Sequence, residues 1–276
     1  MTAQTMPARR GLARAASDVS VIVKRNMRRN LRLPQLLLFA TVQPVMFLLL
    51  FTYVFGGAIG EAIPAAAAGK YINWLVPGLL VQVSVFGAGQ TATGLTEDLA
   101  GGVIDRFRSL PMARSAVLAG RTLADAARNG FVMSLMLAVG ALIGFRVQTS
   151  VLALIPGLAL VLLFAFAMSW VMAAVGLLVK NPEAAQSAAF IPVFPLVFAS
   201  SIFVPTQTMP AWLRAFADHQ PITVTTNAVR GLLLGDGALP ACASVAGQAA
   251  QSVLWSVAIL AVFSILAVGL YRRAAQ

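Results

Sequence analysis

Six long apolar runs constrain this chain more than any other feature of its sequence. They cover residues 35–55, 74–95, 123–145, 151–179, 184–204 and 251–271, and a helix needs about 20 predominantly apolar residues to cross a bilayer. Hydrophobic residues make up 59% of the chain and charged ones only 11%, whereas a soluble domain carries about 25% charged residues. We therefore expect an all-α integral membrane protein with six transmembrane helices. The composition excludes a soluble enzyme, a disordered chain and a disulfide scaffold.

The distribution of basic residues orients these spans. The chain has 20 Lys and Arg residues against 9 Asp and Glu, and cytoplasmic loops of membrane proteins carry the excess of Lys and Arg. With the N-terminus inside, only four basic residues fall on the outer side: Lys70, Arg146, Arg214 and Arg230. The pattern predicts a multi-pass protein with both termini in the cytoplasm, comprising an N-terminal part (1–34), a membrane domain (35–271) and a short tail (272–276). It also accounts for the net charge of +11 without a nucleic-acid partner.

Residues 17–33 have the pattern of a basic amphipathic helix. Its apolar side chains share one face, and the opposite face carries Lys24, Arg25, Arg28, Arg29 and Arg32. Such a helix lies in the inner-leaflet interface, among lipid headgroups. Two interpretations stay open: an electrostatic anchor that only sets the topology, or a helix that also contacts a cytoplasmic partner.

A second amphipathic segment, residues 96–115, joins the second and third spans. An apolar stripe of Leu99, Val103, Phe107 and Leu110 recurs at helical spacing, and Pro111 ends the helix. The other faces carry Glu97, Asp98, Asp105, Arg106 and Arg108. The segment is too short and too charged to span, so we expect it to dock into a groove on another protein; a solvated connector is the alternative.

The segment 205–237 should lie on the outer side. Pro210 stands at a permitted first-turn position of a short helix that contains Trp212, and Pro221 follows the break at His219. A second short helix then runs to Gly235. Both helices are too short to cross the bilayer, so we expect a re-entrant or interfacial pair before the last span.

The motifs of catalytic and nucleotide-binding proteins are absent from the sequence. It has no G-x-x-x-x-G-K-[ST] loop, no H-E-x-x-H and no G-x-S-x-G. One cysteine, Cys242, and one histidine, His219, cannot build a Cys- or His-based metal site. We expect a chain that is not catalytic by itself and that binds neither a metal nor a cofactor.

Few polar groups fall inside the spans. Asp125 lies between Arg121 and Arg128, and a local ion pair explains it better than a role in gating. Gln43, Gln82 and Gln90 either contact a substrate or make hydrogen bonds between helices. They are the candidates for a translocation path. His219 stands beside Asp218 and is interpreted as an ordinary loop histidine.

Two runs of the sequence resemble the type-2 ABC transporter permeases, and within them the daunorubicin-resistance (DrrB-like) branch. Between the second and third spans stands Asp105-Arg106-Phe107-Arg108-Ser109-Leu110-Pro111-Met112, followed by Arg114. The outer run contains Pro205, Met209-Pro210-Ala211-Trp212-Leu213, Pro221, Arg230-Gly231 and Gly235. The resemblance covers nearly the whole chain.

This resemblance implies a division of labour. Such permeases dimerise in the bacterial plasma membrane and associate with two copies of a separate ATP-binding subunit, which holds ATP and Mg²⁺. The helix around residues 105–110 would be the coupling helix, and residues 17–33 the connecting helix against the same subunit. Substrate would pass along the dimer interface, lined by the first, second and fifth spans.

The resulting functional prediction is the membrane subunit of an exporter for a hydrophobic or amphiphilic compound, such as a drug or a lipid. A polysaccharide or glycolipid exporter of the same family is the alternative. An ion-coupled carrier or a membrane enzyme would be a different class. The spans lack the acidic residues near the middle of the membrane that an ion-coupled carrier needs. The sequence also lacks the catalytic clusters of a membrane enzyme.

Overall fold

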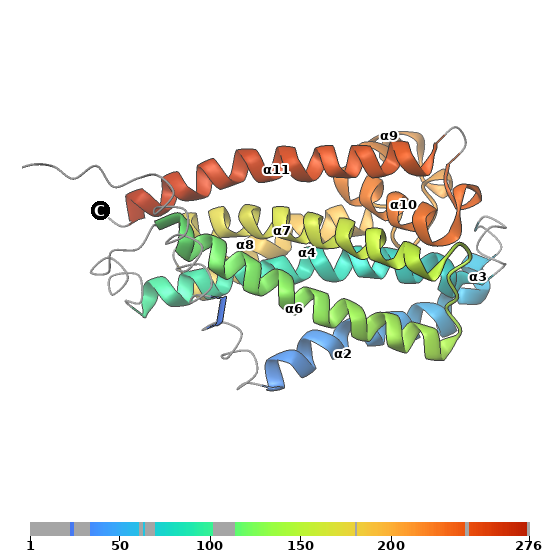
Figure 1. Cartoon of the computed structure of the whole chain (residues 1–276), viewed down its shortest axis with the longest axis horizontal. Coiled ribbons are helices and arrows are strands. Elements are labelled where there is room, and N and C mark those ends of the chain that lie inside the picture. Colours follow the sequence, from blue (N-terminus) through green and yellow to red (C-terminus); the bar gives the residue numbers. More distant parts are fainter. Residues whose placement is uncertain are drawn as a thin grey trace, which may run out of the picture.

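The computed structural model describes residues 23–24, 34–60, 63, 70–101, 114–179, 181–240 and 243–274, and every regular element in these ranges is a helix. The long helices run side by side along one axis (Figure 1). The C-terminal end of α11 (Val245–Ala274) lies at one end of the bundle, whereas α2 (Pro34–Leu50) begins about midway along it. The short helices gather at the other end.

Five helical stretches in the described residues are long and apolar enough to cross a membrane. The first runs from α2 through a π-helical segment, Phe51–Phe55, into α3 (Gly56–Gly60). The others are α4 (Tyr71–Ala100), α6 (Arg114–Ile143), α7 (Leu154–Val179) with a preceding 3-10 turn (Val151–Ala153), and α11. They match the predicted first, second, third, fourth and last spans. Helices α4 and α11 extend beyond both predicted ends, whereas α6 begins nine residues before its predicted start and ends two residues before its predicted end.

The predicted span 184–204 is shorter in the structure. Helix α8 (Pro182–Phe198) has 17 residues, begins with an Asn181 cap whose Oδ1 accepts a hydrogen bond from the Glu183 N–H (2.9 Å), and contains two prolines. It ends at Phe198 because residues 199–204 turn back, with the Ser200 hydroxyl donating to the Val197 carbonyl (2.5 Å). The exact count of six spans is therefore not confirmed.

Two short helices precede α11, as predicted. Helix α9 (Ala211–His219) begins after Pro210, which is its N-cap residue and so stands one position before the predicted first turn. Helix α10 (Pro221–Leu234) starts with Pro221 in its first turn and ends at Gly235, whose φ of +92° favours glycine. Short 3-10 turns, Thr206–Thr208 and Asp236–Ala238, flank the pair.

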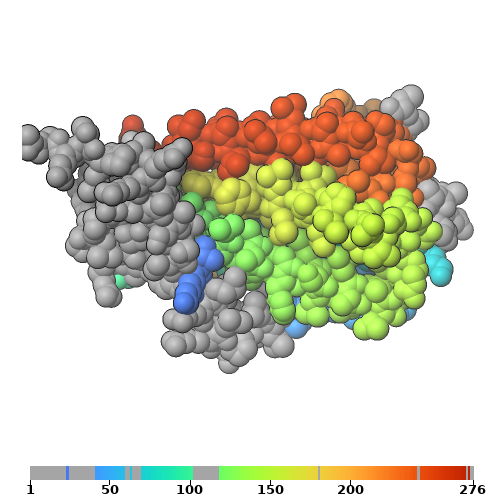
Figure 2. All heavy atoms as spheres, viewed as in Figure 1, coloured from blue at the N-terminus to red at the C-terminus, as the bar shows by residue number. Residues whose placement is uncertain are grey.

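Helix α4 forms the centre of the bundle. In its most apolar stretch 83% of the residues are buried, against 11% in α11 and 6% in the first span. Small residues let α7 approach it closely: a Cβ at Gly176 would lie 2.7 Å from the Ala92 carbonyl oxygen. On the face seen in Figure 2, α6, α7 and α11 form one continuous surface. The outer helices thus leave apolar side chains exposed, as lipid permits.

Two of the predicted amphipathic segments fall mainly outside the described residues. In the segment 17–33 only Val23 and Lys24 are described, both helical, with Lys24 exposed. Glu97 and Asp98 belong to the last turn of α4. The remaining predicted interface residues lie outside the described ranges, namely Arg25, Arg28, Arg29, Arg32, Asp105, Arg106, Phe107, Arg108, Leu110 and Pro111.

A fully buried arginine joins three elements at the end that holds the short helices. Arg230 of α10 donates from Nε to the Trp74 carbonyl (3.0 Å), from Nη2 to the Ile202 carbonyl (2.9 Å) and from Nη1 to the Ser201 hydroxyl (3.1 Å). Its guanidinium also lies 3.6 Å from the centre of the Trp74 ring. Among the described residues no ion pair involves it, so carbonyl dipoles and the ring solvate its charge. Gly78 provides room, because a Cβ there would lie 3.2 Å from Nη2.

We predict that Arg230→Met strongly destabilises the protein, because it leaves three buried acceptors, on α4 and on the turn after α8, without their donor. The expected loss is about 3 kcal/mol or more, and Arg230→Lys should recover only part of it because one ammonium cannot replace the planar fork. The measurement is the unfolding temperature of the purified protein in detergent. The control is Arg214→Met, since Arg214 is half-exposed and, within the described ranges, its ion pair is with Asp218 at 3.5 Å. An Arg230→Met protein that unfolds at the wild-type temperature would contradict the proposed role.

Candidate functional site

The three glutamines predicted to line a path do converge on one cavity. The side chain of Gln82 on α4 is buried, whereas those of Gln43 on α2 and Gln90 on α4 are exposed. All three line a cavity of about 260 Å³ whose walls come from α2, α4 and α6. Phe47 and Phe86 provide aromatic surface, and Asn129 of α6 adds a further amide that the sequence analysis did not single out.

A second cavity of about 190 Å³ shares three lining side chains with the first. Gln43, Phe86 and Gln90 line both cavities, and the second one adds residues of α8 such as Gln186 and Phe190. These three side chains therefore separate a space next to α6 from a space next to α8. Most of the remaining lining is apolar, which is the usual character of a site for an organic ligand.

A file of phenylalanine rings leads away from the second cavity. Phe86 contacts Phe190 with ring centres 5.7 Å apart, and the contacts continue through α8 and the turn after it to the π-helical segment that follows α2. Successive ring centres along this file are 4.4–5.7 Å apart. Its members are Phe86, Phe190, Phe194, Phe198, Phe203, Phe51 and Phe55. The i, i+4 spacing of three of them on α8 is the sequence signal that could have revealed it.

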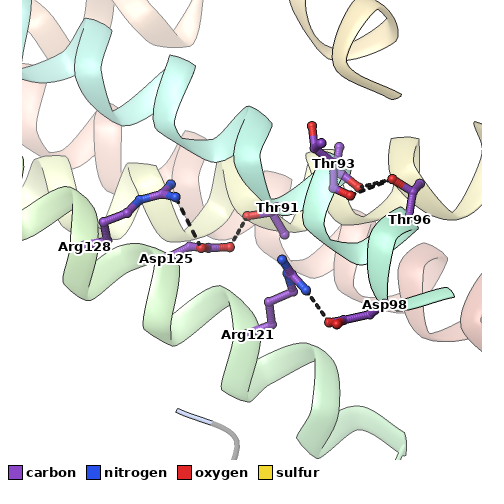
Figure 3. Close-up of polar contacts among 8 residues, drawn as sticks. Thr91, Thr93, Thr96, Asp98, Arg121, Asp125 and Arg128 are labelled. Carbon is purple, nitrogen blue, oxygen red and sulfur yellow. Dashed lines mark hydrogen bonds and ion pairs between the residues drawn. The ribbon is translucent and has the colours of Figure 1, made fainter. Parts of the chain in front are cut away.

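A polar seam joins α4 to α6 beside the first cavity (Figure 3). Arg121 of α6 forms an ion pair with Asp98 in the last turn of α4. Further along, the Thr91 hydroxyl donates to Asp125 (2.6 Å), and Arg128 lies 3.9 Å from the same carboxylate. Arg128 also donates to the carbonyl of Gly87 on α4 (2.9 Å). The buried carboxylate of Asp125 is thus neutralised and hydrogen-bonded.

The predicted local ion pair of Asp125 is confirmed, and its partner is Arg128. Arg121, the other basic residue near it in the sequence, reaches across to Asp98 on α4 instead. Gly94 is the physical reason: the guanidinium of Arg121 occupies the space that a side chain at that position would fill. Spacing within one helix could not reveal this partner on another.

The predicted outer residues have different environments. Trp212 is 75% exposed on α9, together with exposed Pro210, and Pro221 begins α10. Arg230 lies in the protein interior. The His219 ring Nδ1 lies 2.9 Å from the Ala215 carbonyl of its own helix, in agreement with an ordinary histidine at a helix end.

The chemistry available around the two cavities is non-covalent. Amide groups, aromatic rings and neutralised ion pairs can hold an organic molecule and exchange hydrogen bonds with it. The ion pair of Asp98 with Arg121 stands at the end of the seam, next to the chain that connects α4 to α6.

Known proteins resemble this chain over most of its length. A daunorubicin resistance ABC transporter permease protein (DrrB1) of Streptomyces coeruleorubidus is 33% identical over 99% of this chain and 91% of its own. A probable doxorubicin resistance ABC transporter permease protein (DrrC) of Mycobacterium tuberculosis is 25% identical over 85% of this chain and 81% of its own. A putative transport permease (ycf38) of Cyanophora paradoxa is 23% identical over 78% and 73%.

The family model described as "ABC-2 type transporter" matches residues 17–234. This match covers the first amphipathic segment, the polar seam, both cavities and the short helix pair. The helical architecture agrees with it, since the described residues contain five helices of spanning length. The chain therefore belongs to the ABC-2 type transporter family.

Proposed function

We propose that this chain is the permease subunit of an ATP-driven exporter that moves a hydrophobic or amphiphilic compound out of the cell. The observation that carries the proposal is the pair of amide- and phenylalanine-lined cavities, which continue into the file of aromatic rings along α8. Apolar walls with a few polar groups suit an amphiphile. The names of two relatives, which refer to daunorubicin and doxorubicin resistance, favour a drug as the substrate.

An ion-coupled carrier is less well supported. A proton-coupled mechanism needs an ionisable group that changes partners within the membrane. Asp125 already accepts a hydrogen bond from Thr91 and lies beside Arg128, so a structural ion pair accounts for it. ATP supplied by a partner is the simpler source of energy.

The proposed topology has six crossings with both termini in the cytoplasm. Helix α8 is the additional crossing: its 17 residues extend about 26 Å, close to the thickness of the hydrocarbon core. From Phe190 onward its exposed side chains are apolar and include Phe190, Ile191 and Phe194, whereas exposed polar residues such as Glu183 lie near its start. On this arrangement α9 and the largely buried α10 form a re-entrant pair on the outer side. The excess of Lys and Arg in the segments predicted to be cytoplasmic supports it.

The partner that provides energy is a separate ATP-binding subunit. This chain has no phosphate-binding loop, so ATP and Mg²⁺ would bind to two copies of that subunit, associated with a dimer of this chain in the bacterial plasma membrane. The coupling segment (105–111) and the basic helix (17–33) are the proposed contact regions. Hydrolysis would act on α4 and α6 through the Asp98–Arg121 ion pair.

We predict the topology through three single cysteines in a Cys242→Ser background. Arg29→Cys and Ser109→Cys should react with a membrane-impermeant maleimide only in inside-out vesicles, and Gln207→Cys only in intact cells. The physical reason is the retention of Lys and Arg on the cytoplasmic side. Labelling of position 109 in intact cells would rule out this orientation.

We predict that Phe107→Ala weakens association with the ATP-binding subunit, because a buried apolar anchor commonly contributes about 2 kcal/mol or more. Transport should be lost while the permease still inserts into the membrane. If Arg108 pairs with an acidic rim of the groove, Arg108→Ala should cause a smaller and salt-sensitive defect of about 0–1 kcal/mol. Co-purification of the two subunits and ATP-dependent export are the measurements.

The double variant Phe107→Ala, Leu110→Ala provides the decisive comparison. Wild-type association and transport in that protein would mean that the segment is only a connector. A larger defect in Arg108→Ala than in Phe107→Ala would mean that the contact is mainly electrostatic.

We predict that Asp98→Asn and Arg121→Gln uncouple hydrolysis from export. Both side chains are largely buried, so each single change removes this ion pair and leaves the opposite charge in a largely buried place. Each should reduce the number of molecules exported per ATP, and the double variant should be no worse than either single one. The control is Arg214→Gln, which removes an exposed ion pair on α9. Additive defects in the double variant would show that the two residues act independently.

A further inference from the structure

The first span contains a π-helical turn in its second half. Residues Phe51–Phe55 have π-helical geometry, and they lie between the α-helical stretches α2 and α3. The hydrogen bonds of a π-helix reach five residues along the chain, and such helices occur mostly as single turns inside α-helices, frequently at functional sites. The turn must therefore be held by contacts with other parts of the molecule.

A buried hydroxyl in this turn lacks a hydrogen bond. Within the described ranges, Oγ1 of Thr52 is buried and has no partner. Threonines in α-helices commonly bond to the carbonyl four residues earlier, as Thr122 of α6 does when its hydroxyl donates to the Leu118 carbonyl (3.1 Å). The equivalent acceptor for Thr52 in an α-helical first span is the Leu48 carbonyl. The hydroxyl therefore favours an α-helical form of this turn over the π-helical form.

A stacked pair of aromatic rings favours the π-helical form. Phe51 stacks on Phe203, with ring centres 4.4 Å apart and planes 21° apart. Phe203 lies in the turn after α8, and its carbonyl accepts a hydrogen bond from the Tyr71 hydroxyl (2.7 Å). The same tyrosine lies against the start of α3, since a Cβ at Gly56 would be 3.9 Å from its ring. The second half of the first span is thus attached to α4 and to the turn after α8.

Helix α2, which precedes the π-helical turn, is held less tightly. It lies at the edge of the bundle (Figure 1), and only 6% of the most apolar stretch of the first span is buried. Its exposed side chains include Val42, Met46, Leu49 and Leu50. While α3 stays attached, a change of the π-helical turn to an α-helical one turns α2 about its axis by about 100°, the angle of one residue in an α-helix. The shallow packing of α2 permits this rotation.

Such a rotation would change the walls of both cavities. Gln43 and Phe47 of α2 line the first cavity, and Gln43 also lines the second. A turn of about 100° would carry both side chains away from the cavity walls. It would also separate Phe51 from Phe203 and so break the phenylalanine file. The two forms of one turn therefore correspond to two different linings of the cavities.

We infer that the π-helical turn is a two-state hinge that rotates α2, with Phe51 stabilising the described form and Thr52 the rotated one. Thr52 is in this sense a positioning residue, because it acts on the cavities through the rotation of α2. The inference rests on the proposed export function for its purpose, since a change of cavity lining would serve the release of a bound compound. The rotation itself is a property of the permease alone.

The test measures the rotation with two spin labels, attached to Met46→Cys on α2 and Leu135→Cys on α6 in a Cys242→Ser background. Both positions are exposed, 60% and 36% respectively. Distances are measured by pulsed electron paramagnetic resonance on the full-length permease in lipid nanodiscs, diluted with unlabelled permease so that only distances within one chain are recorded. A rotation of α2 moves the first label around a helix about 10 Å wide, so the two forms give different distances.

Two substitutions should shift the populations in opposite directions. Thr52→Val should lower the ratio of the rotated form to the described form about tenfold, the effect of one hydrogen bond. Phe51→Leu should raise the same ratio about tenfold, because it removes the ring stack. The double variant should lie close to the wild type, since the two changes act on opposite forms. It also shows the effect of Thr52→Val where both forms are populated.

The matched control is Thr122→Val, which removes the hydroxyl of a threonine that already has its bond within an α-helix. It should leave the distances unchanged, and so should Thr52→Ser, which keeps the hydroxyl. A second label pair, on Leu135→Cys and Leu254→Cys of α11, should give one distance in every variant. If Phe51→Leu does not fold, Phe203→Leu removes the same ring stack from the other side.

Three results would overturn the inference. They are a single, unchanged distance in all variants, a shift in the same direction by Thr52→Val and Phe51→Leu, or a shift by Thr122→Val as large as that by Thr52→Val. A failure of the proposed function is recognised separately, by the absence of ATP-dependent export from the wild-type permease with its ATP-binding subunit. An active exporter whose α2 does not rotate would refute only the hinge.

Discussion

The buried guanidinium of Arg230 is the interaction on which the arrangement of this bundle depends. A charge without a carboxylate partner is costly inside a membrane protein, and here two backbone carbonyls, a hydroxyl and the Trp74 ring solvate it. These groups belong to the start of α4, to the turn after α8 and to α10. The contact therefore fixes where α8 ends, and the turn after α8 brings Phe203 against Phe51, with ring centres 4.4 Å apart.

The polar seam plays a corresponding part towards the other end of α4. The seam consists of three contacts between α6 and α4, which follow one another along the two helices. The pairs are Arg121 with Asp98, Asp125 with Thr91, and Arg128 with Gly87. Asn129 follows directly and lines the first cavity. Arg121 and Asn129 are eight residues apart on α6, which is about 12 Å along the helix. A displacement of Arg121 at the ion pair would therefore move Asn129 at the cavity, because both belong to one rigid helix.

Local signals predicted much of the fold. The apolar run 151–179 and the break at Pro221 appear in the structure as expected, since hydropathy and proline act on the chain nearest to them. The end of α8 was predicted six residues too late, because apolar side chains in the turn 199–204 continue the hydropathy of the helix. The three glutamines were predicted as candidates, whereas Asn129, Phe86 and the aromatic file were not.

The sequence by itself determined that this is a helical membrane protein and which segments are apolar enough to span. Only the tertiary structure decided which polar groups meet. Arg230 bonds to a residue 156 positions away, and Asp125 to one 34 positions away. Such pairs depend on how each helix is rotated about its axis, and the packing of neighbouring helices sets that rotation. Gly94 leaves room for the side chain of Arg121, and Gly176 leaves room for the backbone of α4. Spacing along one helix does not contain this information.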